Sequence, residues 1–477
     1  MRYSTPPVRP AARAILLATL FALQGAAPGN RAEAAPPGPP AKAKLRGYIT
    51  SRVDDATVAI LDDRIQLSKG GHVEPLIPTP ELRGVTFDGL KAGELIEAEG
   101  VWEGKHKFSA DRISVEAGWL GKLVHETAYL QGEPDQAARI ANGDPAELQV
   151  DGEWLVLGDK TRRGWPPPET LRAAKDDPPG AAAAPAVYAG RQVRYGGVRR
   201  DDGKIEADVV ELADPAPPDA YDMHHGSIAR GKDPQTGIDI LEARRNDKVV
   251  SRMKLFPVPA VQQYVAELGT SLLPAGDLGT TRDLEFRFFV VEDPAVNAQS
   301  LPDGTVLVDT GLLGAVDSEA ELAFVLSHEI AHVLQAHTWR ETTETRPARV
   351  GLTIAGIAGS LYAGDTSIFL AQLGMAAVVN GHERSLENQA DRLGIQTIID
   401  RGYDPREATR FFRFVIERYG EDSTSKIWSN HESSVMRGSL LTVQMEREYP
   451  SGHFDGARAN TPAFVAMHEA LGPVKIE

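Results

Sequence analysis

One segment of this chain occurs twice, and the repetition limits the fold of the first half more than any other feature. Ala92–Val115 and Ala189–Leu212 align at an offset of 97 residues. In each copy apolar and polar residues alternate on both sides of a turn, a period that predicts two antiparallel strands. The repeat therefore predicts two copies of one small β-barrel module, at 45–116 and 117–213. The identical pairs are Ala92/Ala189, Gly93/Gly190, Gly100/Gly197, Val101/Val198, Lys107/Lys204, Ala110/Ala207 and Asp111/Asp208.

The two modules resemble the small oligonucleotide-binding-type (OB) barrels of bacterial envelope proteins, through one short motif per copy. Barrels that bind nucleic acid combine a basic groove with aromatic stacking platforms. This chain has 51 Lys and Arg against 67 Asp and Glu, a formal net charge of −16, whereas phosphate backbones are held by basic side chains. A spacer or protein-docking role is therefore favoured, with no nucleic acid as partner. A Pro- and Ala-rich insertion at 165–186 in the second copy is expected to be a disordered loop.

The first 34 residues are expected to be a cleaved secretory signal peptide. Arg2, Arg9 and Arg13 precede the apolar run Ala14–Leu23, and Ala32–Ala34 fits an A-x-A cleavage site. An uncleaved anchor is the alternative, but the run is too short to span a bilayer. Cleavage there would remove four arginines and one glutamate and leave a net charge of −19. The absence of cysteine excludes a disulfide scaffold and a thiolate metal site, and it suits an exported protein of the bacterial periplasm.

Two short segments rich in Pro and Ala are expected to be linkers, at 35–44 before the first module and at 214–219 after the second. Beyond them apolar residues recur with helical spacing, as in Ala260–Leu273. The predicted fold is therefore multidomain. Two small all-β, OB-like barrels are followed by an α+β, mostly helical domain at 220–477.

Three other apolar stretches belong to this last domain. Glu285–Val291 and Thr305–Val308 are expected to be strands. Val350–Gly364 is apolar but Gly-rich and too short to span a bilayer. A core helix, a helix that covers the active site and a membrane-surface segment remain open for it, and the last would give peripheral membrane contact.

The motif His328-Glu329-Ile330-Ala331-His332 lies in a strongly apolar predicted helix, which opens with the capping box Ser318–Glu321. Four residues correspond to about 400° of helix, so the two histidines share one face and can bind one tetrahedral zinc ion. Glu329 lies beside the open position of such a metal, where it can accept a proton from the zinc-bound water and pass it to the leaving amine. Two surface or satisfied core histidines are the alternative, but the apolar flanks indicate a buried helix, and burial of both histidines with a glutamate and no metal would be costly.

A second pair with the same spacing, Glu387 and Asp391, shares one face of a later predicted helix. Glu387 would ligate the zinc, and Asp391 would orient a ligand histidine without touching the metal. Taken alone, such a carboxylate pair is more often a solvated helix face. His337 lies about 900° of helix from His328, half a turn out of phase, so it is expected to be structural and not to touch the metal.

Short motifs spread over residues 220–440 carry a family resemblance. They are Asp293–Ala298, Leu301–Val306, Thr310–Leu313, Glu321–Ala323, the HEIAHVLQAH stretch, Glu383–Asp391, and Ser429–His431 with Arg437. Together they resemble the HtpX/BepA-type zinc metallopeptidases, metallopeptidase family forty-eight. The chain departs from the family's S-R-x-x-E-x-E-A-D element at Glu383 and Gln389, and from its S-x-H-P-x-x-x-x-R element at Glu432.

The resemblance implies a gluzincin that holds one zinc ion per chain through His328, His332 and Glu387, with Glu329 as the base. Arg384, like Asp391, would support the site without contacting the metal. His431 would be catalytic as an oxyanion stabiliser, or would ligate the zinc and shut the site; a surface loop histidine is the alternative. An extended peptide would pair with an edge strand that includes Asn297 and Ala298.

The sequence thus predicts an exported zinc endopeptidase of the bacterial cell envelope. By resemblance, its substrates would be unfolded or misassembled envelope proteins, and its task would be protein quality control. The alternative is a zinc-bound but proteolytically idle, chaperone-like protein of the periplasm, in which Val350–Gly364 and His431 block the site.

Overall fold

The chain divides into residues 1–41 and a second unit, residues 42–477, which holds every element below. The computed structural model describes residues 42–77, 82–116, 118–119, 122–129, 146–164, 191–223, 226–274, 284–344, 365–366, 369–370, 384–419 and 434–476. The expected signal peptide, most of the first linker, the 165–186 insertion, Val350–Gly364 and His431 lie outside these ranges.

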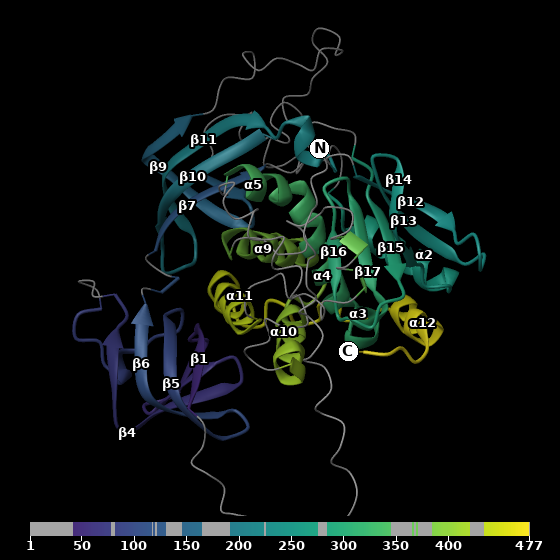
Figure 1. Cartoon of the computed structure of the whole chain (residues 1–477). Helices are drawn as coiled ribbons and strands as arrows, with labels where there is room; N and C mark the ends of the chain where they lie inside the picture. Colours follow the sequence, from purple (N-terminus) through teal and green to yellow (C-terminus); the bar gives the residue numbers. More distant parts are fainter. Residues whose placement is uncertain are drawn as a thin grey trace, which may run out of the picture. The chain divides into compact units, whose positions relative to one another are not determined.

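The first repeat copy belongs to a six-stranded sheet (Figure 1). Alternate residues of its strands face a shared apolar core, which includes Leu45, Ile65, Ile96, Phe108 and Ile113. β4 and β6 pair in parallel, and the other neighbours are antiparallel. The strands are β1 (Ala43–Tyr48), β2 (Ser51–Asp54), β3 (Thr57–Ile60), β4 (Asp63–Pro75), β5 (Leu95–Gly104) and β6 (Lys107–Glu116), in the order β1-β5-β6-β4-β3-β2.

The second copy belongs to a five-stranded sheet that repeats this topology. Its order, β7-β10-β11-β9-β8, matches β1-β5-β6-β4-β3 of the first sheet strand for strand. The sequence repeat therefore corresponds to one hairpin, which is β5–β6 in the first sheet and β10–β11 in the second. The strands are β7 (Leu123–Tyr129), β8 (Glu147–Val150), β9 (Glu153–Gly164), β10 (Arg191–Arg199) and β11 (Ile205–Pro215).

A shared glycine explains part of the repeat. Both hairpins change register immediately before it, between Glu99 and Gly100 in one and between Gly196 and Gly197 in the other. A Cβ atom on Gly100 would lie 2.0 Å from the carbonyl oxygen of Ser109, and one on Gly197 would lie 2.1 Å from that of Glu206. The bulge thus requires a residue without a side chain at this position.

A three-stranded antiparallel sheet follows, which no pattern in the sequence predicted. It consists of β12 (Gly226–Lys232), β13 (Asp239–Arg245) and β14 (Lys248–Lys254). The segment expected to be a linker, 214–219, contains the end of β11 and the start of the 3₁₀ helix η4 (Pro218–Tyr221). Tyr221 is buried against Tyr129 and Ala336, so this connection is packed into the structure.

The remaining described residues form a helical domain around a small mixed sheet. β15 (Arg287–Val291) pairs in parallel with β17 (Thr305–Asp309), and β16 (Ala298–Ser300) is antiparallel at the sheet edge. Among the described helices, none is both long and apolar enough to cross a bilayer. The helices are α2 (Pro259–Leu272), α3 (Thr310–Ala315), α4 (Glu319–Leu334), α5 (His337–Glu344), α9 (Arg384–Asp400), α10 (Arg406–Tyr419), α11 (Ser434–Glu448) and α12 (Pro462–Leu471).

Candidate metal centre

The helix that carries the HExxH motif is the core of this domain. All residues of α4 are buried, and α4 packs against α2, α9, α10 and β16. Ser318 caps its start by accepting a hydrogen bond from the Glu321 N–H at 3.2 Å. Glu321 accepts in turn from the N–H of Asp317 at 2.7 Å, so the capping box is shifted by one residue from the predicted form.

α9 approaches α4 closely because of Gly394. A Cβ atom there would lie 3.3 Å from both the backbone nitrogen of His328 and the ring of Phe324. Glu387 is two helical turns before Gly394 and so lies on the same face of α9. The close packing therefore brings Glu387 against the two histidines of α4.

His328, His332 and Glu387 form a buried group whose ligand atoms all lie within 4.8 Å of one another. The two Nε2 atoms are 2.9 Å apart. The carboxylate oxygens of Glu387 lie 3.6 Å from Nε2 of His328 and 3.5 Å from Nε2 of His332. Ligands at typical zinc distances are separated by about 3.3 Å along the edge of a tetrahedron. The donor set and its spacing thus fit a tetrahedral zinc ion.

Asp391 holds the non-ligating nitrogen of His328. Its Oδ1 lies 3.0 Å from Nδ1 of His328, so the Nδ1–H donates to the carboxylate and leaves Nε2 for the metal. Arg437 of α11 donates to both oxygens of Asp391, at 2.8 and 2.6 Å. Burial alone would raise the pKa of Asp391, but Arg437 and His328 hold it well below its usual range. Burial, together with Arg437, also lowers the pKa of His328 and favours the neutral, metal-binding form.

Glu329 lies on the side of α4 that faces β16, the edge strand of the β15-β17-β16 sheet. Its Oε1 has no hydrogen-bond partner in the described part of the chain. Burial raises the pKa of Glu329 to about 8, against hydrogen bonds from Ser300 at the end of β16 that act in the opposite direction. The predicted base therefore lies between the metal ligands and the edge strand.

His337 lies next to the metal ligands. The prediction that it continues the helix of His328, half a turn out of phase, is wrong. α4 ends at Leu334, and Ala336 has a φ of 50°, so the helix does not continue to residue 337. The break turns the ring of His337 back, and its Nδ1 lies 2.8 Å from Nδ1 of His332. Its Nε2 lies 2.8 Å from Oε1 of Gln389 on α9. His337 thus contacts a metal ligand and not the metal position, a role that its spacing did not reveal.

Three other residues within the described ranges were predicted for the site, namely Asn297, Ala298 and Arg384. Ala298 begins the edge strand β16 and Asn297 precedes it, and both are buried. Arg384 lies at the start of α9 with an exposed side chain. Gln389 and Ser300 had no predicted role, and Arg437 was predicted only as part of a motif. Ser300 contacts the base Glu329, and Arg437 lies 3.5 Å from the ligand Glu387, whereas Gln389 contacts His337.

Comparison with known proteins shows what this domain is similar to. The model of peptidase family M48 matches residues 259–453. A protein of Vibrio cholerae serotype O1, whose name provisionally assigns it to the beta-barrel assembly-enhancing proteases, is 36% identical over 169 residues, 34% of each chain. The beta-barrel assembly-enhancing protease of Escherichia coli O157:H7 is 31% identical over 170 residues, again 34% of each chain. The mitochondrial metalloendopeptidase OMA1 of Arabidopsis thaliana is 30% identical over 167 residues, 33% of this chain and 31% of that protein.

The family match lies in the domain that holds the metal ligands. The shared region covers about a third of the length of the bacterial relatives, and the family match begins after β14. His328, His332 and Glu387 all fall inside the matched residues. Residues 259–453 are thus similar to peptidase family M48, and all three candidate ligands lie in this similar region.

Proposed function

We propose that this protein is a zinc-dependent metalloendopeptidase. The observation that carries the proposal is the buried set of three donor atoms with a glutamate beside it. His328, His332 and Glu387 would hold the metal, and Glu329 follows the first ligand on the same helix. The match to peptidase family M48 and the similarity to a relative named as a metalloendopeptidase support the same activity.

The residues of the site have distinct tasks in peptide hydrolysis. A zinc ion held there would supply Lewis acidity and lower the pKa of water. Glu329 accepts a proton from the attacking water and passes it to the leaving amine. Asp391 keeps His328 oriented, while burial and Arg437 keep it neutral. His431 is proposed to stabilise the developing oxyanion.

An extended peptide is the proposed form of the substrate. β16 lies at the edge of its sheet, and its last residue, Ser300, contacts Glu329. A peptide that adds to this edge would lie beside the base and the metal ligands. The cavity in this region, about 10 Å³ and lined by Ser300, Leu301 and His332 among others, holds about one water molecule.

The proposed setting is the bacterial cell envelope. The signal peptide expected at 1–34, the absence of cysteine and the names of the bacterial relatives support an exported, periplasmic protein. Unfolded or misassembled envelope proteins are the proposed substrates, in quality control. The six-stranded and the five-stranded sheet are proposed to be OB-like modules that dock proteins and bind no nucleic acid.

Zinc content and cleavage of an unfolded protein test the proposal together. Glu329→Gln should bind zinc as tightly as the unmodified chain and lose at least about 100-fold in cleavage rate. Glu387→Ala should lose zinc, because two imidazoles alone hold it weakly. Glu267→Gln, an exposed position on α2, is the matched control and should change neither quantity.

Two outcomes would contradict the proposal. Full zinc content in Glu387→Ala would refute the ligand assignment. If the unmodified chain and Glu329→Gln hold equal zinc but the unmodified chain cleaves none of the unfolded substrates tried, the idle, chaperone-like alternative is favoured.

A further inference from the structure

Two side-chain amides of the peptidase domain contact the backbone of β7, the first strand of the second β sheet. Gln335, at the end of α4, accepts from the N–H of Tyr129 at 2.7 Å and donates to its C=O at 2.9 Å. Gln389, on α9, donates to the C=O of Thr127 at 3.1 Å. Both glutamines are buried. Thr127 and Tyr129 are two residues apart, so these backbone groups point to the same side of the strand, and β7 is an edge strand of its sheet.

Gln389 is also linked, through His337, to the metal ligand His332. Arg340 determines which way the amide of Gln389 is oriented. Arg340 donates to Oε1 of Gln389 at 2.7 Å, and a guanidinium cannot accept a hydrogen bond. The Gln389 atom that faces Arg340 must therefore be the amide oxygen and not the amide nitrogen. The Nε2 of His337 contacts the same oxygen and so must donate to it. In a neutral ring the Nδ1 of His337 is then an acceptor.

The same logic fixes the tautomer of His332. Because Nδ1 of His337 accepts, Nδ1 of His332 carries a hydrogen and donates across the 2.8 Å contact. The Nε2 of His332 is left with its lone pair, which is the state that binds a metal. An unbroken chain of hydrogen bonds thus runs from the ligand His332 through His337 and Gln389 to the C=O of Thr127.

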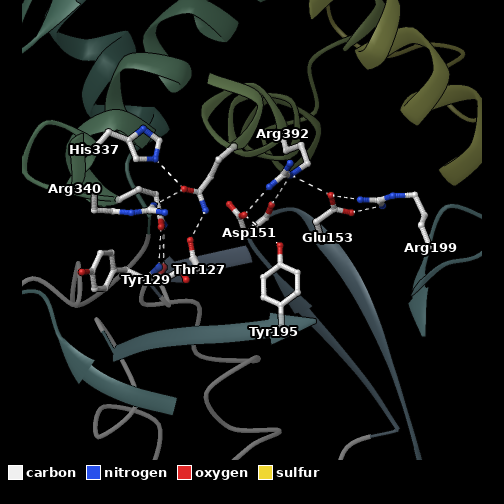
Figure 2. A network of polar contacts seen from close by, with 11 residues as sticks. Thr127, Tyr129, Asp151, Glu153, Tyr195, Arg199, His337, Arg340 and Arg392 are labelled. Atoms are coloured by element: carbon white, nitrogen blue, oxygen red, sulfur yellow. Dashed lines mark hydrogen bonds and ion pairs between the residues drawn. The ribbon is translucent and has the colours of Figure 1, made fainter. Parts of the chain in front are cut away.

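An amide is needed at residue 389 for this chain to reach the β sheet. Its oxygen accepts from His337 and Arg340, while its nitrogen donates to Thr127. A carboxylate could serve the first two partners but has no hydrogen for the third. Figure 2 shows His337 and Arg340 on one side of the contact and Thr127 on the other.

Buried ion pairs fix the same sheet to the same helix beside this contact. Arg392, one turn after Gln389 on α9, binds Asp151 at 2.7 Å and Glu153 at 3.2 Å (Figure 2). Glu153 also pairs with Arg199 of β10 at 2.6 Å. The sheet that contains β7 is therefore joined to α9 by buried ion pairs as well as by the hydrogen bond of Gln389.

We propose that the second β sheet is part of the support of the metal centre, in which the backbone of β7 orients the ligand His332 through Gln389 and His337. Gln389 and His337 are positioning residues. The inference rests on the metal ligation of the proposed function and not on peptide hydrolysis.

Gln389→Glu tests the link to the sheet specifically. The carboxylate of this variant would still accept from His337 and Arg340, but its second oxygen would face the carbonyl of Thr127 and move away. We expect Zn²⁺ and Co²⁺ affinity, measured by chelator competition, to fall about tenfold or more, and the visible absorption of the Co²⁺-loaded protein to shift. Gln396→Glu is the matched control, because Gln396 is on the same helix and contacts Gln149 of the same sheet at 2.9 Å, without touching His337. Its affinity should change less than about threefold.

The outcomes separate the inference from the proposed function. Unchanged or tighter metal binding by Gln389→Glu would overturn the inference, because orientation of His332 would then come from the peptidase domain alone. An equal loss in both variants would also overturn it. Failure of the unmodified chain to bind either metal would refute the metal site itself.

A measurement on the unmodified chain keeps the inference testable if Gln389→Glu does not fold. Hydrogen exchange is compared in the zinc-loaded and metal-free protein. The amides of residues 123–129 should exchange at least about fivefold more slowly with zinc, while residues 51–60, in the first sheet, should not change. Identical exchange of β7 in both states would overturn the inference.

Discussion

At the residue scale, the metal centre depends on charges that have been removed from water. Asp391, Arg437, Glu387 and the two ligand histidines are all buried. A buried ion pair contributes little net stability, but removal of one partner leaves the other charged and unsolvated. Arg437 therefore matters through Asp391, whose carboxylate it keeps ionised and which in turn holds His328.

Asp391→Asn tests this arrangement. An asparagine can still accept from His328, but it leaves the Arg437 cation with only the more distant carboxylate of Glu387, at 3.5 Å. We expect unfolding free energy to fall by about 3–5 kcal/mol in urea and zinc affinity to fall about 10–100-fold by chelator competition. Asp400→Asn, at the exposed end of the same helix, should alter neither. Native zinc affinity in Asp391→Asn would show that Asp391 does not support the ligand.

At the element scale, the repeated hairpin owes its shape to a bulge that only glycine permits. Gly100→Ala and Gly197→Ala would each place a Cβ about 2 Å from a carbonyl oxygen. Relief of that contact requires movement of the paired strand, so we expect each to lose at least about 2 kcal/mol in urea unfolding. At Gly104 and Gly158, by contrast, a Cβ atom would have no described atom within 4 Å beyond its chain neighbours. Their alanine variants are the controls and should stay within about 1 kcal/mol of the unmodified chain. Equal effects at all four positions would refute this account of the repeat.

Local rules predicted the elements of the site, and non-local contacts escaped them. Helical spacing placed His328 with His332, and Glu387 with Asp391, because four residues return to one face of a helix. The prediction for His337 was wrong in its geometry, because it extended the helix past Ala336, where φ is positive. The β12–β14 sheet was missed because its strands carry many charged residues and bury few positions, which weakens the alternation that marks a strand.

At the scale of the whole molecule, the structure joins the second β sheet to the peptidase domain through partners far apart in the chain. Gln335 and Tyr129 are separated by 206 positions, and Gln389 and Thr127 by 262. Nothing in the sequence near either residue marks it as a contact. Composition showed an acidic protein, but it could not show that carboxylates and arginines are paired inside this interface.

The interface should be sensitive to pH through Glu448 of α11. Burial, together with the nearby Glu153, raises the pKa of Glu448 to about 8 from 4.5, although Arg199 and Arg392 oppose the shift. A raised pKa favours the protonated form in the folded state. Stability from this group is therefore complete below about pH 4.5 and is lost as the pH rises through about 8. Urea unfolding should show lower stability at pH 9 than at pH 6.

Glu448→Gln should flatten this dependence. We expect the variant to gain on the order of 1 kcal/mol at pH 9, a modest figure because part of the side chain is exposed and screened by water. Glu469→Gln, on the exposed side of α12, should leave the pH dependence unchanged. The assignment to Glu448 fails if both variants follow the curve of the unmodified chain.

An edge strand with open backbone groups recruits strands from other chains. In the folded protein the amides of Gln335 and Gln389 occupy those groups at Tyr129 and Thr127. The cover is thus supplied by α4 and α9 and not by the sheet itself. If these helices unfold while the sheet survives, the strand nearest the metal centre becomes a template for aggregation.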